Sequence, residues 1–198
     1  MNTRKSSHNA KRDAGGKLRI IGGQWRGRQL QFPAVEGLRP TGDRIRETVF
    51  NWLTGYTAHA RCLDVFSGSG AMALEALSRG AAHVTALELD RSAAQTIQQH
   101  GKTLAASNLT VHNVNSLDWL KAGNNAEPFD IVFIDPPFAA ELAEQCVALL
   151  LQGNWLSPEA WIYVEADRKL AKPEFAENIV EHRYKESGQV RYGLYYLS

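Results

Sequence analysis

Cysteine is scarce in this chain of 198 residues, and no long apolar run occurs in it. Cys62 and Cys146 lie far apart, which argues against a disulfide-stabilised secreted fold and indicates buried free thiols of a cytoplasmic protein. No apolar segment approaches the ~20 residues of a membrane-spanning helix. The N-terminus is polar and basic without an apolar core, so it lacks the form of a secretory signal. The six histidines show no metal-ligand spacing, and we expect no metal.

The net charge is only +1, but the charges are unevenly distributed along the chain. Residues 1–46 hold 11 basic and 3 acidic side chains, or +8, and the remainder holds 11 basic and 18 acidic side chains, or −7. A basic front end on an acidic body indicates a polyanionic partner such as RNA, although a solvated basic tail has the same composition. Residues 1–16 have no apolar periodicity, and we predict that they are a disordered basic tail.

Residues 17–40 predict a small extension built from two strands, Leu18–Ile21 and Arg28–Phe32. Such a pair is too small to be stable alone, so it should pack on a main domain that spans residues 41–198. The tryptophan in the connection suits two roles, stacking on a base while neighbouring guanidinium groups meet phosphates, or covering the junction between extension and domain. The predicted RNA-contacting residues of the connection are Trp25, Arg26 and Arg28.

The next segment, LRPTGDRIRETVFNWL, predicts a helix capped by Thr41 or Asp43, because its apolar residues recur at helical spacing. An arginine in the first turn of a helix is disfavoured by the helix dipole unless an anion is present. Phosphate contact is therefore a hypothesis for this segment, and a solvated helix face is the alternative. The candidate residues are Arg39, Arg44 and Arg46.

The stretch CLDVFSGSGAMALEALSRG predicts a strand at Cys62–Phe66, a tight loop, and a helix that ends near Ser78. Gly68 and Gly70 allow a ligand to approach the main chain, and the start of the helix presents unpaired N–H groups to it. Glu88 ends the next strand, about 20 residues after the loop, the interval expected between a glycine loop and a ribose-binding acid. The stretch is therefore predicted to bind a nucleoside.

Strands and helices alternate after this loop, which indicates a parallel sheet with helices on both faces. The last two strands, predicted at 178–184 and 190–197, flank Ser187-Gly188 and form a hairpin. The predicted fold is α/β, a Rossmann-like seven-stranded, mostly parallel sheet with a terminal antiparallel hairpin and a small N-terminal β-hairpin extension. The remaining predicted elements are helix 92–106, strand 109–114, strand 129–134, helix 139–151 and strand 161–165.

The loop itself leaves open which nucleoside is bound. Gly68, Gly70 and Ala73 fit G-x-G-x-x-A, the pattern of dinucleotide sites. Asp64, however, lies four residues before the first glycine, where a carboxylate suits a cationic ligand such as S-adenosylmethionine. A second apolar strand ends in Asp-Pro-Pro-Phe at residues 135–138, which also favours S-adenosylmethionine.

The side chain of Asp135 and the carbonyl of Pro136 suit hydrogen bonds from one exocyclic amine. Holding both hydrogens of the amine turns its lone pair toward a sulfonium methyl group, which gives an in-line displacement. Pro136 and Pro137 stiffen this loop, and Phe138 offers a face on which the base stacks. A target base within a double-stranded or folded RNA would have to leave its base stack.

These residues resemble the S-adenosylmethionine-dependent methyltransferases that act on exocyclic amines, and RPTGDRIRETVFNWL, DVFSGSGAMALEALSRGA and FIDPPF in this order resemble the RsmD family. The resemblance implies methylation of N2 of guanine 966 in bacterial 16S ribosomal RNA, and the substrate is either naked RNA or the small ribosomal subunit. We expect the protein to be a monomer. The resemblance also implies that residues 135–138 hold the guanine. It implies a cofactor site formed by Asp64, Phe66, Ser67, Gly68, Ser69, Gly70, Glu88, Leu89, Asn115 and Ser116.

One departure from the family pattern concerns the adenine of the cofactor. The family usually has an acid just after the third strand, and here Ser116 occupies that place, with Asn115 beside it. The adenine contact therefore stays open. Three alternative functions also stay open at this point: an adenine-N6 nucleic-acid methyltransferase, an NAD-dependent oxidoreductase, and a non-catalytic RNA-binding protein that retains the fold.

Overall fold

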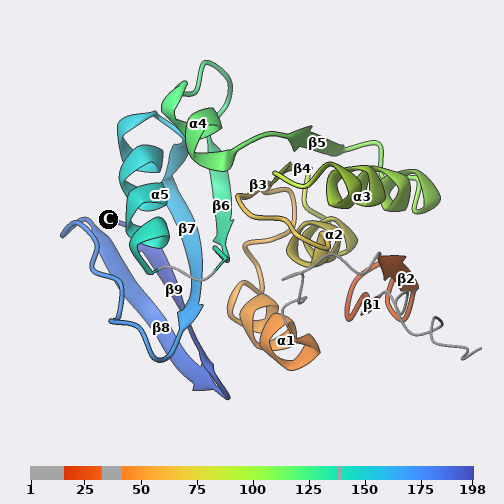
Figure 1. Cartoon of the computed structure of the whole chain (residues 1–198), viewed down its shortest axis with the longest axis horizontal. Helices are drawn as coiled ribbons and strands as arrows, with labels where there is room; N and C mark the ends of the chain where they lie inside the picture. The colour runs from red at the N-terminus through yellow and green to blue at the C-terminus, as the bar shows by residue number, and fades with distance from the viewer. Residues whose placement is uncertain (1–15, 33–41, 138–139) are drawn as a thin grey trace, which may run out of the picture.

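The fold is seen in a computed structural model that describes residues 16–32, 42–137 and 140–198. Its centre is a seven-stranded sheet in the order β5-β4-β3-β6-β7-β9-β8 (Figure 1). This confirms the predicted strand number and the α/β class. The strands are β3 (Arg61–Asp64), β4 (His83–Glu88), β5 (Leu109–Asn113), β6 (Phe129–Ile134), β7 (Leu156–Asp167), β8 (Ile179–Ser187) and β9 (Val190–Leu197).

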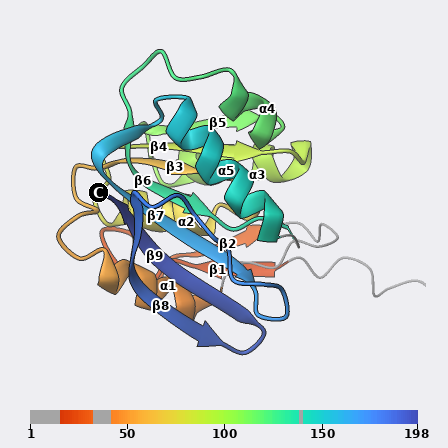
Figure 2. The ribbon, with the colours of Figure 1, turned by 90° about the vertical axis from the view of Figure 1, so that its left-hand side faces the viewer.

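Strands β3 to β7 are parallel, and β9 pairs antiparallel with both β7 and β8. The terminal hairpin is therefore confirmed, with β9 inside the sheet and β8 at its edge (Figure 2). The chain runs outward from β3 to β5 and then returns to place β6 beside β3. This reversal makes the carboxyl ends of β3 and β6 the point of the sheet where open α/β folds bind ligands.

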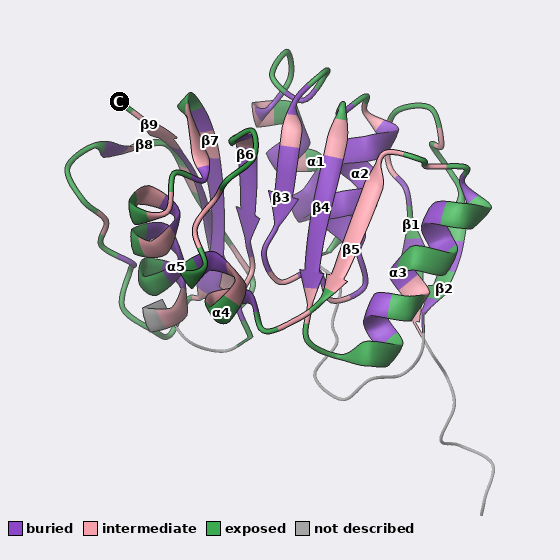
Figure 3. Cartoon of the chain, turned by 90° about the horizontal axis from the view of Figure 1, so that it is seen from above, coloured by how far each residue is buried: buried purple, intermediate pink, exposed green. Residues whose placement is uncertain are grey.

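Helices cover both faces of the sheet (Figure 3). Apolar residues of α1 (Asp43–Trp52) and α2 (Ala71–Ser78) pack against one face, and those of α4 (Ser116–Lys121) and α5 (Ala140–Gln152) against the other. The remaining helix, α3 (Arg91–Thr103), lies between β4 and β5 in the chain and contacts the N-terminal hairpin. Helix α4 was missed by the sequence analysis because its six residues are too few for a periodic pattern.

The start of α1 differs from the prediction. Gly42 is the N-cap residue, and it makes no side-chain cap, whereas Asp43 is the first residue of the helix. The Asp43 carboxylate instead accepts hydrogen bonds from Arg19 Nε at 3.1 Å and Arg46 Nη2 at 2.7 Å. Thr41, the other predicted cap, lies outside the described residues. Asp43 therefore ties the N-terminal extension to the helix.

The N-terminal hairpin consists of β1 (Gly16–Arg19) and β2 (Gln29–Phe32), paired antiparallel. Its buried side chains pack on Ala71 and Leu74 of α2 and on Leu104, just after α3. This confirms the prediction that the pair packs on the main domain. The hairpin residues in this cluster are Leu18, Ile20, Leu30 and Phe32.

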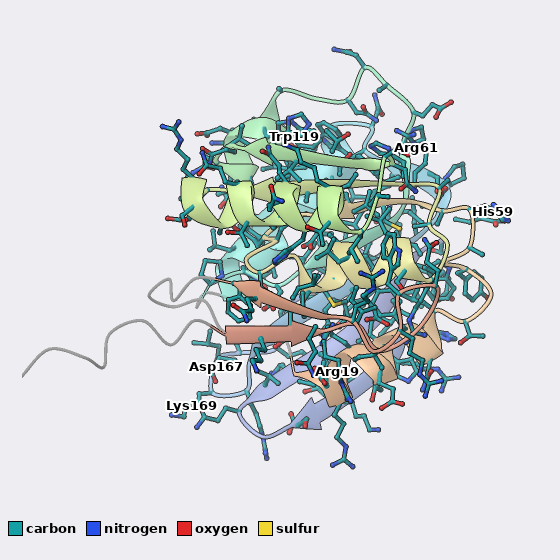
Figure 4. The ribbon with its side chains drawn as sticks, turned by 90° about the vertical axis from the view of Figure 1, so that its right-hand side faces the viewer. Arg19, His59, Arg61, Trp119, Asp167 and Lys169 are labelled. Atoms are coloured by element: carbon teal, nitrogen blue, oxygen red, sulfur yellow. The ribbon has the colours of Figure 1, made fainter. Side chains whose placement is uncertain are left out.

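The turn of the hairpin is attached to the C-terminal end of α2. Trp25 N donates to Ser78 Oγ at 3.0 Å, and Ser78 Oγ donates to the Gly22 carbonyl at 2.6 Å. Gly23 lies so close to the Ser78 carbonyl that an added Cβ would be 1.7 Å from its oxygen. In Figure 4 this turn points toward the side of Arg61, at the start of β3, and away from Asp167, at the end of β7. The turn therefore lies at the amino edge of the sheet.

Two further expectations concern the cysteines and the apolar segments. Cys62 and Cys146 are free and buried, as predicted, and burial raises the pKa of both thiols. None of the helices in the described residues is both long and apolar enough to cross a membrane.

Candidate active site

The glycine loop after β3 is held in a left-handed conformation at two positions. Gly68 has φ +51° and Gly70 has φ +78°, angles that favour glycine. A Cβ on Gly70 would lie 3.0 Å from Ile97 Cγ1 of α3, whereas a Cβ on Gly68 would have open space around it. The buried Ser67 fixes the loop through its N–H, which donates to the Leu87 carbonyl of β4 at 2.9 Å. The main chain at Gly68 is therefore open to a ligand.

Glu88 ends β4 and binds the same loop. Its Oε2 accepts a hydrogen bond from Gly68 N at 2.6 Å, and its Oε1 accepts one from Asp90 N at 2.7 Å. Burial raises the pKa of Glu88, and these two hydrogen bonds oppose the shift. A carboxylate has about four acceptor sites, so Glu88 keeps acceptor capacity for a diol. The predicted partnership between the glycine loop and its acid is thus present in the geometry.

Leu89 and Asn115 follow neighbouring strands at the same edge. The Leu89 side chain is 69% exposed, a large apolar surface suited to packing against a flat base. Asn113 Nδ2 fixes this segment by donating to the carbonyls of Glu88 and Leu89 at 3.0 and 2.8 Å. Asn115 caps α4, because its Oδ1 accepts from Leu117 N and Asp118 N.

Ser116 is buried, and its hydroxyl donates to the Val65 carbonyl at the end of β3. Phe66, also in the predicted cofactor set, packs half-buried on the core beneath α4 and α5. Ser69 is buried within the loop. Ser116 therefore ties the start of α4 to the segment after β3, while Phe66 and Ser69 are packed within the protein.

Asp64 is a buried acid at the end of β3, only 2% exposed. Its Oδ2 accepts a hydrogen bond from Ala73 N, in the first turn of α2, at 3.2 Å. Burial, together with the nearby charges of Asp135 and Glu88, raises the pKa of Asp64 to about 7, although the Ala73 hydrogen bond opposes the shift. A cation bound beside Asp64 would relieve this penalty, since an opposite charge favours the ionised carboxylate.

Asp135 follows β6, which pairs directly with β3. It is half-buried, and its charge acts on Asp64, so the two acids lie in one site although they are 71 positions apart. Pro136 is buried and Pro137 is exposed. Phe138 lies outside the described residues. The structure therefore brings together the glycine loop, Glu88, Asp64 and Asp135, as the sequence predicted.

The residues predicted to contact RNA differ in how far their side chains are exposed. Arg26 and Arg28 are exposed on the hairpin turn, and Arg44 is exposed in the first turn of α1. Trp25 is half-buried and packs against the core under α1 and α2, which favours its role as a cover for the junction. Arg39 lies outside the described residues.

Arg46 corrects the prediction, because its side chain is only 1% exposed and is used within the protein. Its Nη2 donates to the Arg19 carbonyl at 2.9 Å, and its Nη1 lies 3.5 Å from Glu75 Oε2. It also pairs with Asp43. Arg46 therefore joins α1, α2 and the hairpin and does not face a phosphate.

Two residues of the site were missed by the sequence analysis. Glu165 and Tyr163 of β7 are buried beside Asp135, and their burial, with a smaller effect of the Asp135 charge, raises the pKa of both. They lie in IYVEAD, which looks like the ordinary end of an apolar strand. The only signal was an acid placed level with Asp135 on the neighbouring strand. Within the described parts of the chain, no three His, Cys, Asp or Glu side chains are arranged to hold a metal ion.

Comparison with known proteins places this site in a family. The family model "Conserved hypothetical protein 95" matches residues 18–196. The protein named Ribosomal RNA small subunit methyltransferase D of Escherichia coli (strain K12) is 49% identical over 180 residues, which cover 91% of this chain and 90% of that protein. The chain belongs to the RsmD family.

Solved structures agree with the RsmD assignment. The structure described as "Putative methyltransferase yhhF from Escherichia coli" has a TM-score of 0.85 and 48% sequence identity, and covers 92% of this chain and 99% of that one. SMU.776, a putative methyltransferase complexed with SAH, has a TM-score of 0.72 at 14% identity, covering 98% of this chain and 58% of that one. At this low identity the second likeness shows the fold alone.

Proposed function

We propose that this member of the RsmD family transfers a methyl group from S-adenosylmethionine to the exocyclic N2 of guanine 966 in 16S ribosomal RNA. The observation that carries the proposal is the meeting of Asp64, Asp135 and the glycine loop at the carboxyl ends of β3 and β6. The relatives named Ribosomal RNA small subunit methyltransferase D support the reaction class and the RNA. The choice of N2 of guanine as the methylated atom is the more specific part of the proposal.

The residues of the site fit the cofactor. The open main chain at Gly68 admits a close ligand, the Glu88 carboxylate keeps acceptor capacity for a ribose diol, and the exposed Leu89 suits the adenine. Buried Asp64 suits a positively charged group, because such a group relieves its unfavourable ionisation. S-adenosylmethionine, when bound, supplies an electrophilic methyl group on a positively charged sulfur.

The protein's own part in the reaction is to orient the amine. Asp135 and the carbonyl of Pro136 accept the two N–H groups of the guanine amine, which takes its lone pair out of conjugation with the ring and aims it at the methyl group. Pro136 is fixed in φ and has no N–H, so the acceptors of this loop stay in place. The amine becomes cationic during the transfer, and the Asp135 carboxylate stabilises that charge.

The test combines the purified protein with 16S RNA and with small ribosomal subunits, and identifies the methylated nucleoside by mass spectrometry after hydrolysis. We expect N2-methylguanosine at one position, lost in Asp135→Ala and retained in Glu159→Gln, where Glu159 is an exposed acid near the start of β7. N6-methyladenosine as the product would contradict the proposed base. Binding of NADH in place of S-adenosylhomocysteine in calorimetry would contradict the cofactor.

A further inference from the structure

The edge strand β8 carries charges of opposite sign on its two faces. Arg183 and Lys185 stand opposite residues of β9 that pack against α1, so both lie on the α1 side of the sheet. Glu181 and Glu186 lie on the other side, where each forms a salt bridge. Within the described residues, neither Arg183 nor Lys185 forms an ion pair, and both are exposed. The α1 side of β8 is therefore positively charged.

A β-bulge in β8 adds a histidine to the same face. The register of β8 against β9 shifts between Glu181 and Arg183, so His182 is the extra residue. The centre of its ring lies 5.0 Å from that of Trp161 and 6.5 Å from that of Tyr196. Trp161 packs against the core beneath α1. The bulge therefore turns two consecutive side chains, His182 and Arg183, to the α1 side of the sheet.

Tyr56, which follows α1, extends this group of aromatic rings toward solvent. Tyr56 is 51% exposed, and the centre of its ring lies 4.7 Å from that of Trp161. An exposed ring that rests on a second ring offers a flat apolar face, the arrangement on which an unpaired base stacks. We use the name C-terminal surface for Tyr56, Trp161, His182, Arg183 and Lys185.

The C-terminal surface begins beside the proposed methyl-transfer site. Lys185 stands opposite Tyr192, which stands opposite Glu165 near the carboxyl end of β7. Strand β8 is three strands away from β6, about 14 Å. From Glu165 to Trp161 is four residues of β7, about 13 Å. The surface runs along the terminal hairpin where α1 lies beside it (Figure 2), and its near end is within reach of nucleotides that flank a base in the site.

We propose that the C-terminal surface binds the RNA next to the methylated base, with Arg183 and Lys185 on phosphates and an unpaired base stacked on Tyr56. Positive side chains without an ion pair suit phosphates, and an exposed ring beside them suits a base. The neighbouring elements α1 and β7 also carry exposed acids, Glu47 and Glu159, so the attraction is local to the two basic side chains. This inference deepens the proposed function and rests on it for the RNA. It adds a second contact to the one predicted for the N-terminal hairpin.

The salt dependence of binding tests the charged part of the surface. Binding of 16S RNA is measured by filter retention with S-adenosylhomocysteine present, for wild type and for Arg183→Gln combined with Lys185→Gln. We expect the log–log salt slope of the variant to be smaller by about 1.4, because each phosphate contact with a single strand contributes about 0.7. Lys121→Gln combined with Lys172→Gln removes the same charge from the other side of the sheet and should leave the slope unchanged. An unchanged slope in the first variant, or an equal fall in both, would overturn the proposal.

Two substitutions of Tyr56 test the stacking. Tyr56→Ala should raise the Kd for 16S RNA about 5- to 10-fold, the loss of one stacked base, whereas Tyr56→Phe keeps the ring and should stay within about twofold of wild type. Thermal denaturation checks that both variants are folded. A Kd of Tyr56→Ala equal to that of wild type would overturn the proposal.

The same variants are measured with small ribosomal subunits to identify the partner. Weaker binding to subunits with unchanged binding to naked 16S RNA would assign the surface to a ribosomal protein and would overturn the proposal. Failure of the proposed function would be seen separately, as a different methylated nucleoside made by wild type, because the binding measurements need no methyl transfer.

Discussion

Replacement of Glu75 tests how much one buried acid contributes to the attachment of the N-terminal extension to the domain. The Glu75 side chain is 0% exposed. Its carboxylate accepts hydrogen bonds from Ile21 N and Gly22 N, both at 2.8 Å, and from Arg79 Nε at 2.7 Å. It also lies 3.5 Å from Arg46 Nη1. The hairpin, α1 and α2 therefore meet at this one side chain.

The expected loss of stability follows from what Glu75→Ala leaves behind. Removing one partner of a buried ion pair costs about 3–5 kcal/mol, because the other charge stays buried. Each buried N–H that loses its acceptor costs about 1–3 kcal/mol, but these costs overlap, since a locally detached hairpin recovers water for both. We therefore expect the free energy of unfolding to fall by about 4 kcal/mol. Glu75→Gln keeps one acceptor oxygen, and we expect about half that loss.

Urea denaturation followed by circular dichroism gives these free energies, and hydrogen exchange at Ile21 and Gly22 reports whether the hairpin opens first. Glu47→Ala is the matched control, because Glu47 is an exposed acid of α1, and it should stay within about 0.5 kcal/mol of wild type. A loss below about 1 kcal/mol in Glu75→Ala, with unchanged exchange at both amides, would refute the role of this acid in holding the extension.

Three further outcomes are expected. Gly70→Ala should lower the free energy of unfolding, measured by denaturation, by about 2–3 kcal/mol, and Gly68→Ala should lower it by about 1 kcal/mol. Both glycines have positive φ, but only a Cβ on Gly70 would also meet Ile97. Equal losses in the two variants would contradict this contact. Asp64 has a folded pKa of about 7, above its unfolded value of 3.8, so its contribution to stability is present at low pH and is lost as the pH rises to 7. The stability of wild type relative to Asp64→Asn should therefore increase when the pH is lowered from 7 to 5. A stability difference that stays constant with pH would contradict the raised pKa. Charge reversal at Arg26 and Arg28 together should weaken RNA binding and reduce the log–log salt slope by about 1.5, and an unchanged slope would exclude this turn from the RNA surface.

The sequence was sufficient for the sheet and for the central pair of loops. The apolar runs that became β3 and β6 end in residues that only a ligand site explains, and the carboxyl ends of parallel strands share one edge. Asp64 and Asp135 could therefore be predicted to meet. The two β-rich runs around Ser187-Gly188 also predicted the terminal hairpin, and Gly188 has φ +62° in its turn.

What the sequence could not supply were the partners of charged side chains. Arg46 looked like one of several arginines on a helix face, and its burial depends on Glu75 of a different helix and on the Arg19 carbonyl. Glu75 itself stands as a lone acid in the apolar helix AMALEALS, a signal that in hindsight indicates a buried pair. Glu165 could not be identified either, because its meaning comes from the register of β7 against β6.

The two ends of α2 contact two different regions, the methyl-transfer site and the hairpin turn that we predict to bind RNA. Ala73, in its first turn, binds Asp64 of the transfer site, and Ser78, its last residue, binds the hairpin turn of Trp25. The helix rises about 7.5 Å from Ala73 to Ser78, so the hairpin turn is attached well away from the residue that binds Asp64. Substitutions of Arg26 and Arg28 should therefore raise KM for RNA and leave kcat unchanged, whereas Asp135→Asn should lower kcat. A fall in kcat from the turn variants, measured at saturating RNA, would show that the extension reaches the transfer site.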